Sequence, residues 1–208
     1  YNVKNKNIYL LILIILLVLA FFWSLSLGDV HISTKKIFEI FGNQMFGTNY
    51  DISFTDRYVL LNIRLPRILN AMLVGASLSL CGAIFQAVLL NPLADSYTLG
   101  AASGAAFGAT LAFVLNIFYL SVFSISLFAF FGAILSLAIV LCVAGFKSNL
   151  SSINLIISGI IVATIFSSGI ALLNYLASKD VAYIIFWLMG SFDASNWQNI
   201  LILAVTLV

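Results

Sequence analysis

The sequence predicts an all-α, polytopic transmembrane helical bundle. Of its 208 residues, 63% are hydrophobic and only 8% are charged, whereas about a quarter of the residues in a soluble domain are charged. Uncharged apolar stretches of about 20 residues, the length needed to cross a bilayer, recur along the chain. Barrel strands are disfavoured because their apolar and polar residues alternate over about 10 positions.

We expect one transmembrane domain over residues 1–208, with a first span that is a helix rather than a signal peptide. Its 20 uncharged residues exceed the roughly 7–15 of a signal-peptide core. The chain does not begin with Met and ends inside an apolar run, so we expect it to be incomplete, with its last span truncated. The expected spans cover residues 8–27, 68–90, 100–119, 124–146, 153–176 and 196–208.

A polar connection separates the first two spans at residues 28–65. Apolar residues recur there at helical spacing among lysine and glutamate residues, just after Ser33 and Thr34. This pattern predicts a short amphipathic helix with one of these two residues as its N-cap. We expect the helix to lie on the membrane surface.

A second short apolar segment covers residues 181–192. Its 12 residues are too few to span a bilayer. We expect it to pack at a membrane interface, with Trp187 and Trp197 in the aromatic belt.

Small residues recur at every fourth position along the second and third expected spans. Residues four apart share one helix face, and small side chains let helix backbones approach closely in lipid. The two spans are therefore expected to pack inside a bundle, with polar residues in them bonding to neighbouring helices. The expected packing residues are Gly75, Ser79, Gly82, Gln86, Gly100, Gly104 and Gly108.

Catalysis by this chain is not expected. His31 is its one histidine, and none of its seven acidic residues lies in the middle of a span. No glycine-rich phosphate-binding loop with its lysine is present. We therefore expect no catalytic residue, no metal site, no cofactor and no nucleic-acid partner.

Two arginines, Arg64 and Arg67, flank Pro66 at one end of the second span. They could anchor the membrane interface by extending their side chains toward water. Alternatively, this rigid corner could present two forked donors to the carboxylates of a partner protein.

A proline turn ends the second span at Asn91 and Pro92 and continues to Asp95. Proline disfavours helical conformation in the residue before it, and Asp95 is a suitable cap for the next helix. The segment is either a simple turn or a cytoplasmic loop near a gate or a motor subunit.

The connection before the fifth span is short and polar. Ser151, Ser152 and Asn154 stand there, at residues 151–154. Small polar residues at such a position cap helices, and they could also form a constriction at the membrane face.

At this point the residues resemble a known family. RLPR at residues 64–67, NPLAD at residues 91–95 and SGAAFGA at residues 103–109 occur in the same order and spacing as in the permease subunits of vitamin B12 and iron–siderophore ABC importers. The segment FWLMGSF at residues 186–192 is also similar. The resemblance covers nearly the whole chain.

The resemblance implies a type II ABC importer permease fold of about ten helices, in a multi-pass protein of the bacterial inner membrane. It implies a second permease subunit in a homodimer or heterodimer, two cytoplasmic ATPase subunits that carry the ATP chemistry, and an external substrate-binding protein. It also implies a cytoplasmic N-terminus. Three basic residues would then lie inside and six outside, opposite to the usual tendency, and the external RLPR corner explains part of this excess.

The resemblance further assigns roles to particular residues. Arg64 and Arg67 would dock the binding protein. The cytoplasmic gate would include Ser151 and Ser152, and the translocation path would be lined by Asn154, Ser158 and Gly159. The cytoplasmic turn would comprise Asn91, Pro92 and Asp95.

The expected function is therefore import of an iron–siderophore, haem or cobalamin through the permease. A secondary transporter or channel is the first alternative. It would need charged groups or helix breaks in the middle of its spans, and no acidic or basic side chain lies inside an expected span to support it. A membrane scaffold without transport is the second, and it would leave the RLPR and NPLAD motifs unexplained.

Overall fold

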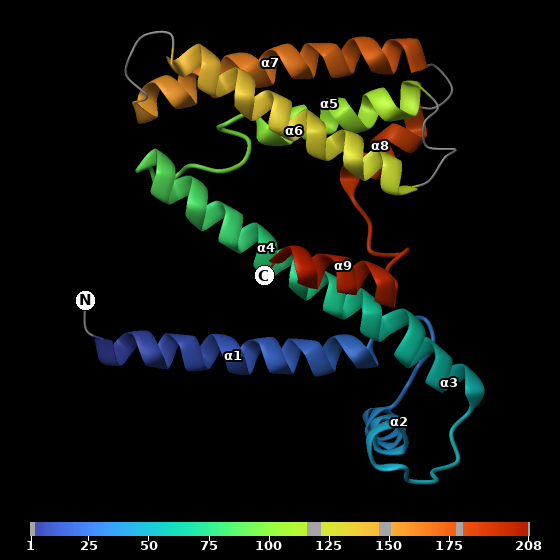
Figure 1. The fold of residues 1–208 in the computed structure, drawn as a ribbon. Coiled ribbons are helices and arrows are strands. Elements are labelled where there is room, and N and C mark those ends of the chain that lie inside the picture. Colours follow the sequence, from blue (N-terminus) through green and yellow to red (C-terminus); the bar gives the residue numbers. More distant parts are fainter. Residues whose placement is uncertain (1–2, 116–121, 146–150, 178–180, 208) are drawn as a thin grey trace. The chain divides into compact units, whose positions relative to one another are not determined.

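The computed structural model describes residues 3–115, 122–145, 151–177 and 181–207. Every regular element in these ranges is a helix, so the predicted all-α class is confirmed (Figure 1). The chain divides into two compact units. The first comprises Tyr1–Ala76 and Phe192–Val208, and the second comprises Ser77–Ser191.

Four stretches of helix in the described ranges are long and apolar enough to cross a membrane. They belong to α1 (Val3–Ser26), to the continuous helix formed by α3, η1 and α4, to α6 (Val122–Gly145) and to α7 (Ser152–Ala177). A shorter apolar helix, α5 (Ala101–Val114), has 14 residues. The expected end of the third span, up to residue 119, lies outside the described residues.

The second membrane-length helix begins at Phe54, earlier than the expected residue 68. It comprises α3 (Phe54–Tyr58), the π-helix η1 (Val59–Arg64) and α4 (Leu65–Leu89). Ser53 starts it, since its Oγ accepts a hydrogen bond from the backbone N–H of Asp56 at 3.1 Å. The sequence carries this signal, a Ser followed three residues later by an acidic residue, within the segment that we expected to be a polar connection.

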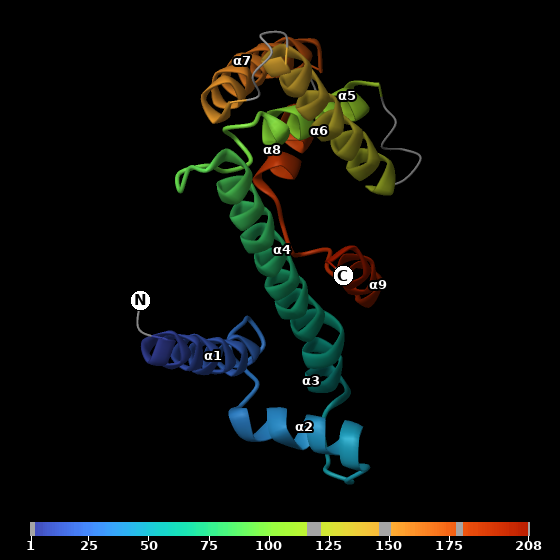
Figure 2. The same ribbon diagram turned by 60° about the vertical axis from the view of Figure 1, so that its left-hand side comes forward.

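Within the first unit, α2 (Thr34–Phe46) packs near the end of α1 (Figure 2). Ser33 is its N-cap and Gly47 ends it in a left-handed conformation. The predicted helix is confirmed, and of the two candidate caps the structure selects Ser33. Ile37 and Ile40 are fully buried against other apolar residues of the unit. This part of the apolar face therefore packs on protein. The cluster contains Leu25, Ile32, Ile37, Ile40 and Leu60.

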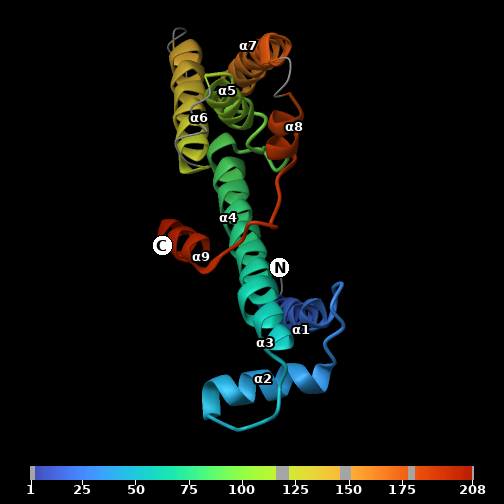
Figure 3. The ribbon, with the colours of Figure 1, turned by 90° about the vertical axis from the view of Figure 1, so that its right-hand side faces the viewer.

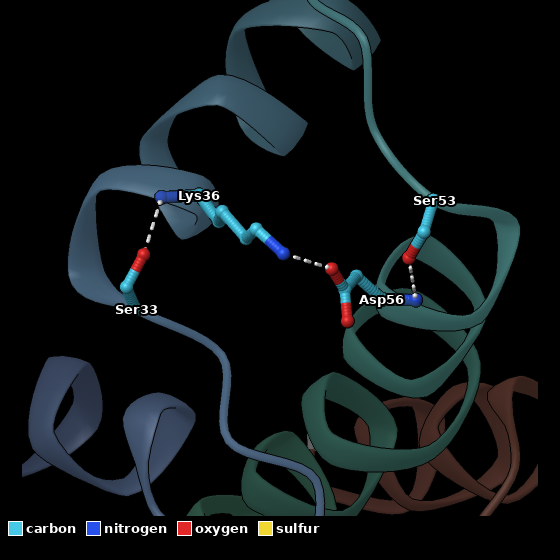
Figure 4. A network of polar contacts seen from close by, with 4 residues as sticks. All are labelled: Ser33, Lys36, Ser53 and Asp56. Atoms are coloured by element: carbon cyan, nitrogen blue, oxygen red, sulfur yellow. Dashed lines mark hydrogen bonds and ion pairs between the residues drawn. The ribbon is translucent and has the colours of Figure 1, made fainter.

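An ion pair joins the first turns of α2 and α3 (Figure 4). Lys36 Nζ lies 2.7 Å from Asp56 Oδ2, and each of the two residues follows a serine cap at the same spacing. The hydrogen bond to this carboxylate, together with its negative charge, raises the pKa of Lys36. The pair therefore connects two helix starts that are 20 residues apart in sequence.

In the second unit, α5 lies between α6 and α7 (Figure 3). Gly104 and Gly132 face each other so closely that a methyl group on either would overlap the backbone of the other. Gly108 lies equally close to the backbone carbonyl of Phe128. Small residues thus let α5 and α6 touch through their backbones, as glycine does in membrane helices.

The last two helices are α8 (Val181–Met189) and α9 (Trp197–Leu207). Trp187 on α8 packs against Phe113 of α5, with ring centroids 6.4 Å apart, and Ile184 beside it is fully buried. Trp187 therefore has a packing partner within its unit, whereas Trp197 is partly exposed in the other unit.

The small residues of α4 are differently placed. No heavy atom outside the local helix lies within 4 Å of a Cβ built on Gly75 or on Gly82. These two glycines therefore have open space where Gly104 and Gly108 of α5 have a neighbouring backbone.

This difference predicts that a glycine-to-alanine substitution has different effects on stability at the two kinds of site. Gly104→Ala should lower the free energy of unfolding by about 1–3 kcal/mol, because the methyl group would overlap Ser136 and Gly132. Gly82→Ala should leave stability unchanged or raise it by up to about 1 kcal/mol, because its site is open. Thermal unfolding of the purified variants in detergent measures both, and equal effects would contradict the packing.

Candidate functional site

The first candidate site is the arginine corner, which we define as Arg64, Arg67 and the segment 192–195. Arg64 ends η1 and is only 8% exposed. Its Nη1 donates to the carbonyl of Leu25 at 2.8 Å and its Nη2 to the carbonyl of Val30. The forked guanidinium therefore ties the end of α1 and the following loop to the long helix.

Gly28 leaves room for this guanidinium. A Cβ at Gly28 would lie 2.5 Å from Arg64 Nη2, and the glycine has a φ of +143°. L-residues rarely adopt this conformation, so both space and backbone require glycine here. Nothing in the sequence marked Gly28 as a partner of Arg64.

Arg67 stands three residues later, in the first turn of α4, and has a different environment. Its guanidinium Nη2 lies 2.8 Å from Asp193 Oδ1, and both side chains remain accessible, 55% and 76% exposed. Of the two arginines, only Arg67 thus presents much of its side chain to solvent.

Asn70 lies one helical turn beyond Arg67 and is buried. Its Nδ2 donates to Ser195 Oγ at 3.0 Å. We expected a bond to a neighbouring helix here, and the partner instead lies in the segment before α9. Arg67 and Asn70 therefore hold the segment 192–195 against α4 at two points.

An open cavity of about 420 Å³ borders the corner. Asp29, Arg64 and Arg67 contribute its charged lining, next to Gly28, Ser24 and Ile63. Positive and negative groups therefore meet at this surface, which suits polar contact with another protein.

The second candidate site is the proline turn, residues 90–99, in the second unit. Asp95 Oδ1 accepts hydrogen bonds from the N–H groups of Tyr97 at 3.0 Å and Thr98 at 2.9 Å. Thr98 Oγ1 accepts from the N–H of Asp95 at 3.1 Å and donates to its carbonyl at 2.7 Å. Asp95 and Thr98 thus close the end of the turn reciprocally.

The start of the proline turn is fixed in the same way. Asn91 Oδ1 accepts from the N–H of Leu93 at 2.9 Å, and Gln86 Nε2 donates to the carbonyl of Pro92 at 2.9 Å. Gln86 therefore bonds to its own turn rather than to another helix. Leu90 adopts a positive φ of 48° where α4 ends, a conformation that is uncommon for a residue other than glycine.

The proline turn packs directly on α6 and α7. Ser136 of α6 is fully buried and its Oγ donates to the carbonyl of Gly100 at 2.7 Å. Gly159 of α7 lies so close to the carbonyl of Thr98 that no side chain would fit. The position of the turn against α6 and α7 therefore depends on Ser136 and Gly159. Of these two, the sequence did not indicate Ser136.

The residues expected at a gate and a path lie in the first turns of α7, except Ser151, which directly precedes the helix. Ser151 Oγ accepts from the N–H of Asn154 at 3.2 Å, so Ser151 caps the helix that begins at Ser152. Ser158 and Gly159 are buried in the chain. The preceding part of the expected gate turn, residues 146–150, lies outside the described residues.

Within the described ranges, no three His, Cys, Asp or Glu side chains are grouped to hold a metal ion. The arginine corner offers charge and hydrogen bonds at a surface, and the proline turn offers a rigid loop. Both properties suit contact with partner proteins.

Comparison with known proteins identifies the family. Residues 16–208 match the model of the FecCD transport family. The chain belongs to this family. The suspected relationship to permeases of vitamin B12 and iron-chelate importers is thereby confirmed.

Relatives of this FecCD family chain include transport permeases with different named cargoes. The molybdate import system permease MolB of Haemophilus influenzae is 36% identical over 192 residues, which cover 91% of this chain and 55% of that protein. The vitamin B12 import system permease BtuC of Klebsiella pneumoniae is 33% identical over 179 residues, which cover 86% and 54%.

A solved structure shares the fold. It is described as an inward-facing conformation of a metal-chelate type ABC transporter and matches with a TM-score of 0.76 at 33% identity, over 96% of this chain and 58% of the other. The chain thus spans a little over half the length of the relatives it matches. The predicted permease fold is confirmed for this part.

The geometry of the two arginines predicts unequal effects of their removal. Arg64→Ala should lower the free energy of unfolding by about 1.5–3 kcal/mol, the range for hydrogen bonds made by a charged group, because it leaves two carbonyls without their donor. Arg67→Ala should cost less than about 1 kcal/mol, as exposed ion pairs do. Chemical denaturation of the two purified variants compares them. Equal losses would show that Arg64 does not hold the corner.

Proposed function

We propose that the protein is the membrane-spanning subunit of an ATP-driven importer. The match of residues 16–208 to the FecCD transport family is the observation that carries this proposal. The four membrane-length helices support a multi-pass protein of the bacterial inner membrane. The chain itself would provide a path and not catalysis.

The proposed complex contains a second permease subunit, identical or related, two cytoplasmic ATPase subunits and an external substrate-binding protein. The names of the relatives include molybdate, vitamin B12 and a metal chelate. We infer that the cargo is a metal-containing solute, with an iron–siderophore, haem or cobalamin as the first candidates and molybdate as the next.

Arg67 is the residue that we assign to direct docking. Its side chain is 55% exposed and its present partner, Asp193, is also accessible. A planar guanidinium binds a carboxylate through two parallel hydrogen bonds, so acidic residues of the binding protein are its natural partners. Arg64 contributes from behind this surface by holding the corner through Leu25 and Val30.

We assign the proline turn, with Asn91, Pro92 and Asp95, to the cytoplasmic side, where it would meet the ATPase subunits or the gate. Its internal hydrogen bonds make it rigid, and a rigid loop can transmit force between subunits. The cytoplasmic gate would include Ser151 and Ser152, and the path would include Asn154, Ser158 and Gly159.

Reconstitution tests the proposal as a whole. The full-length permease would be placed in vesicles with its ATPase subunits and binding protein, and uptake of radiolabelled iron–siderophore, cobalamin and molybdate would be compared. Uptake of one cargo should require ATP, the binding protein and both subunit types. Transport that continues without the ATPase subunits would instead indicate a secondary transporter or a channel.

A charge reversal tests the docking surface. Arg67→Glu should weaken binding of the binding protein at least about tenfold, because like charges would oppose each other at the contact. Lys35→Glu is the matched control, since Lys35 is also exposed and its pair with Glu39 lies on α2; about twofold or less is expected there. Surface plasmon resonance at several salt concentrations measures both, and equal effects would contradict a specific role of Arg67.

A further inference from the structure

We propose that Asp193 is an internal competitor for Arg67, which an acidic residue of the docking protein must displace. The inference rests on the proposed function, because it concerns the regulation of the same docking surface. Its starting point is the 2.8 Å ion pair between Arg67 and Asp193. Asp193 thereby binds the Arg67 guanidinium through a carboxylate, the same group that an acidic partner would use.

The backbone of the segment around Asp193 positions its carboxylate beside Arg67. Its segment is folded into a turn, in which the N–H of Ser195 donates to the carbonyl of Phe192 at 3.1 Å. Asn196 continues the segment and caps α9, because its Oδ1 accepts from the N–H of Asn199 at 2.8 Å. The backbone that carries Asp193 is therefore fixed on both sides.

The neighbouring bond keeps this segment on α4. Asn70 is buried and donates to Ser195 at 3.0 Å, two residues from Asp193 and one helical turn from Arg67. The bond to Asn70 is a buried attachment of the segment, and the ion pair with Arg67 is an exposed one. A partner can exchange the exposed one without removing the other.

The exposed attachment is weak enough to be exchanged. Asp193 is 76% exposed and Arg67 is 55% exposed, and pairs of this kind are only marginally favourable in water. An internal competitor of that strength leaves a fraction of the arginine unoccupied. The apparent affinity of a partner falls in proportion to this fraction, which here corresponds to roughly two- to sixfold.

The competitor also defines the partner. A group that replaces Asp193 must carry a carboxylate and must approach from solvent, where Asp193 itself is accessible. Because Arg67 is already paired with Asp193, a partner carboxylate that replaces Asp193 gains less binding free energy than it would gain from an unpaired arginine. Docking therefore favours a partner whose acidic residue is held in place by further contacts over a freely moving acidic side chain.

The first experiment needs no partner. Phenylglyoxal modifies arginine side chains, and mass spectrometry can follow Arg64 and Arg67 separately in the full-length permease in nanodiscs. Asp193→Asn should raise the modification rate of Arg67 roughly two- to sixfold. Arg64 is an internal control because it is buried and its bonds do not involve Asp193. An unchanged rate at Arg67 would overturn the inference.

The second experiment uses the binding protein that co-purifies with the assembled transporter. Asp193→Asn should tighten its docking roughly two- to sixfold, and this gain should vanish when Arg67 is also replaced by Ala. Asp51→Asn is the matched control, since it removes an exposed negative charge elsewhere in the first unit. Ser195→Ala, which loses the neighbouring bond to Asn70, should give a smaller gain than Asp193→Asn, because the carboxylate that pairs with Arg67 remains.

The outcomes separate the two proposals. If Arg67→Glu abolishes docking but Asp193→Asn changes neither docking nor modification, the competitor is refuted and the docking surface remains. If docking is unchanged in every variant while Asp193→Asn accelerates modification of Arg67, the ion pair exists but the proposed docking surface is wrong. If Asp51→Asn tightened docking as much as Asp193→Asn, the loss of one negative charge anywhere in the unit would explain the effect. That result would also overturn the inference.

Discussion

Direct contact between helix backbones is the interaction on which the second unit depends. Lipid chains are as apolar as leucine, so helices in a membrane associate by close fit rather than by escape from water. Gly104 and Gly132 provide that fit between α5 and α6. Gly159 provides it between α7 and the proline turn. Because these contacts leave no space for side chains, they fix the turn that carries Asp95 and Thr98 in one position.

In the first unit, one buried guanidinium has a comparable role. Arg64 binds two backbone carbonyls from the chain around the end of α1, and the buried position makes each of these bonds costly to lose. Arg67 is close in sequence, yet it lies in solvent with an exchangeable partner. The same residue type thus stabilises the structure at one position and offers an interaction surface at the other.

The relatives show that this framework serves more than one cargo. Permeases named for molybdate and for vitamin B12 are 36% and 33% identical to this chain, so the shared features cannot define a single solute. In this chain the glycines of α5 and α6 form a packed helix pair, residues 90–99 a rigid turn, and Arg64 and Arg67 an arginine corner. Each of these features suits contact between protein segments or subunits rather than recognition of one particular solute.

The sequence by itself determined the helical class, the family and most of the helix positions. The length of an apolar stretch and the spacing of small residues are local properties that can be read directly from the chain. The sequence also indicated a cap at Ser33 or Thr34 and the turn at Asn91–Asp95. The tertiary structure decided which polar groups meet. Arg64 and Val30 are 34 residues apart in the chain, Ser136 and Gly100 are 36 apart, and Arg67 and Asp193 are 126 apart (193 − 67). No local pattern encodes such pairs. Burial then separated Arg64 from Arg67, since only three-dimensional packing determines which of two neighbouring arginines faces water.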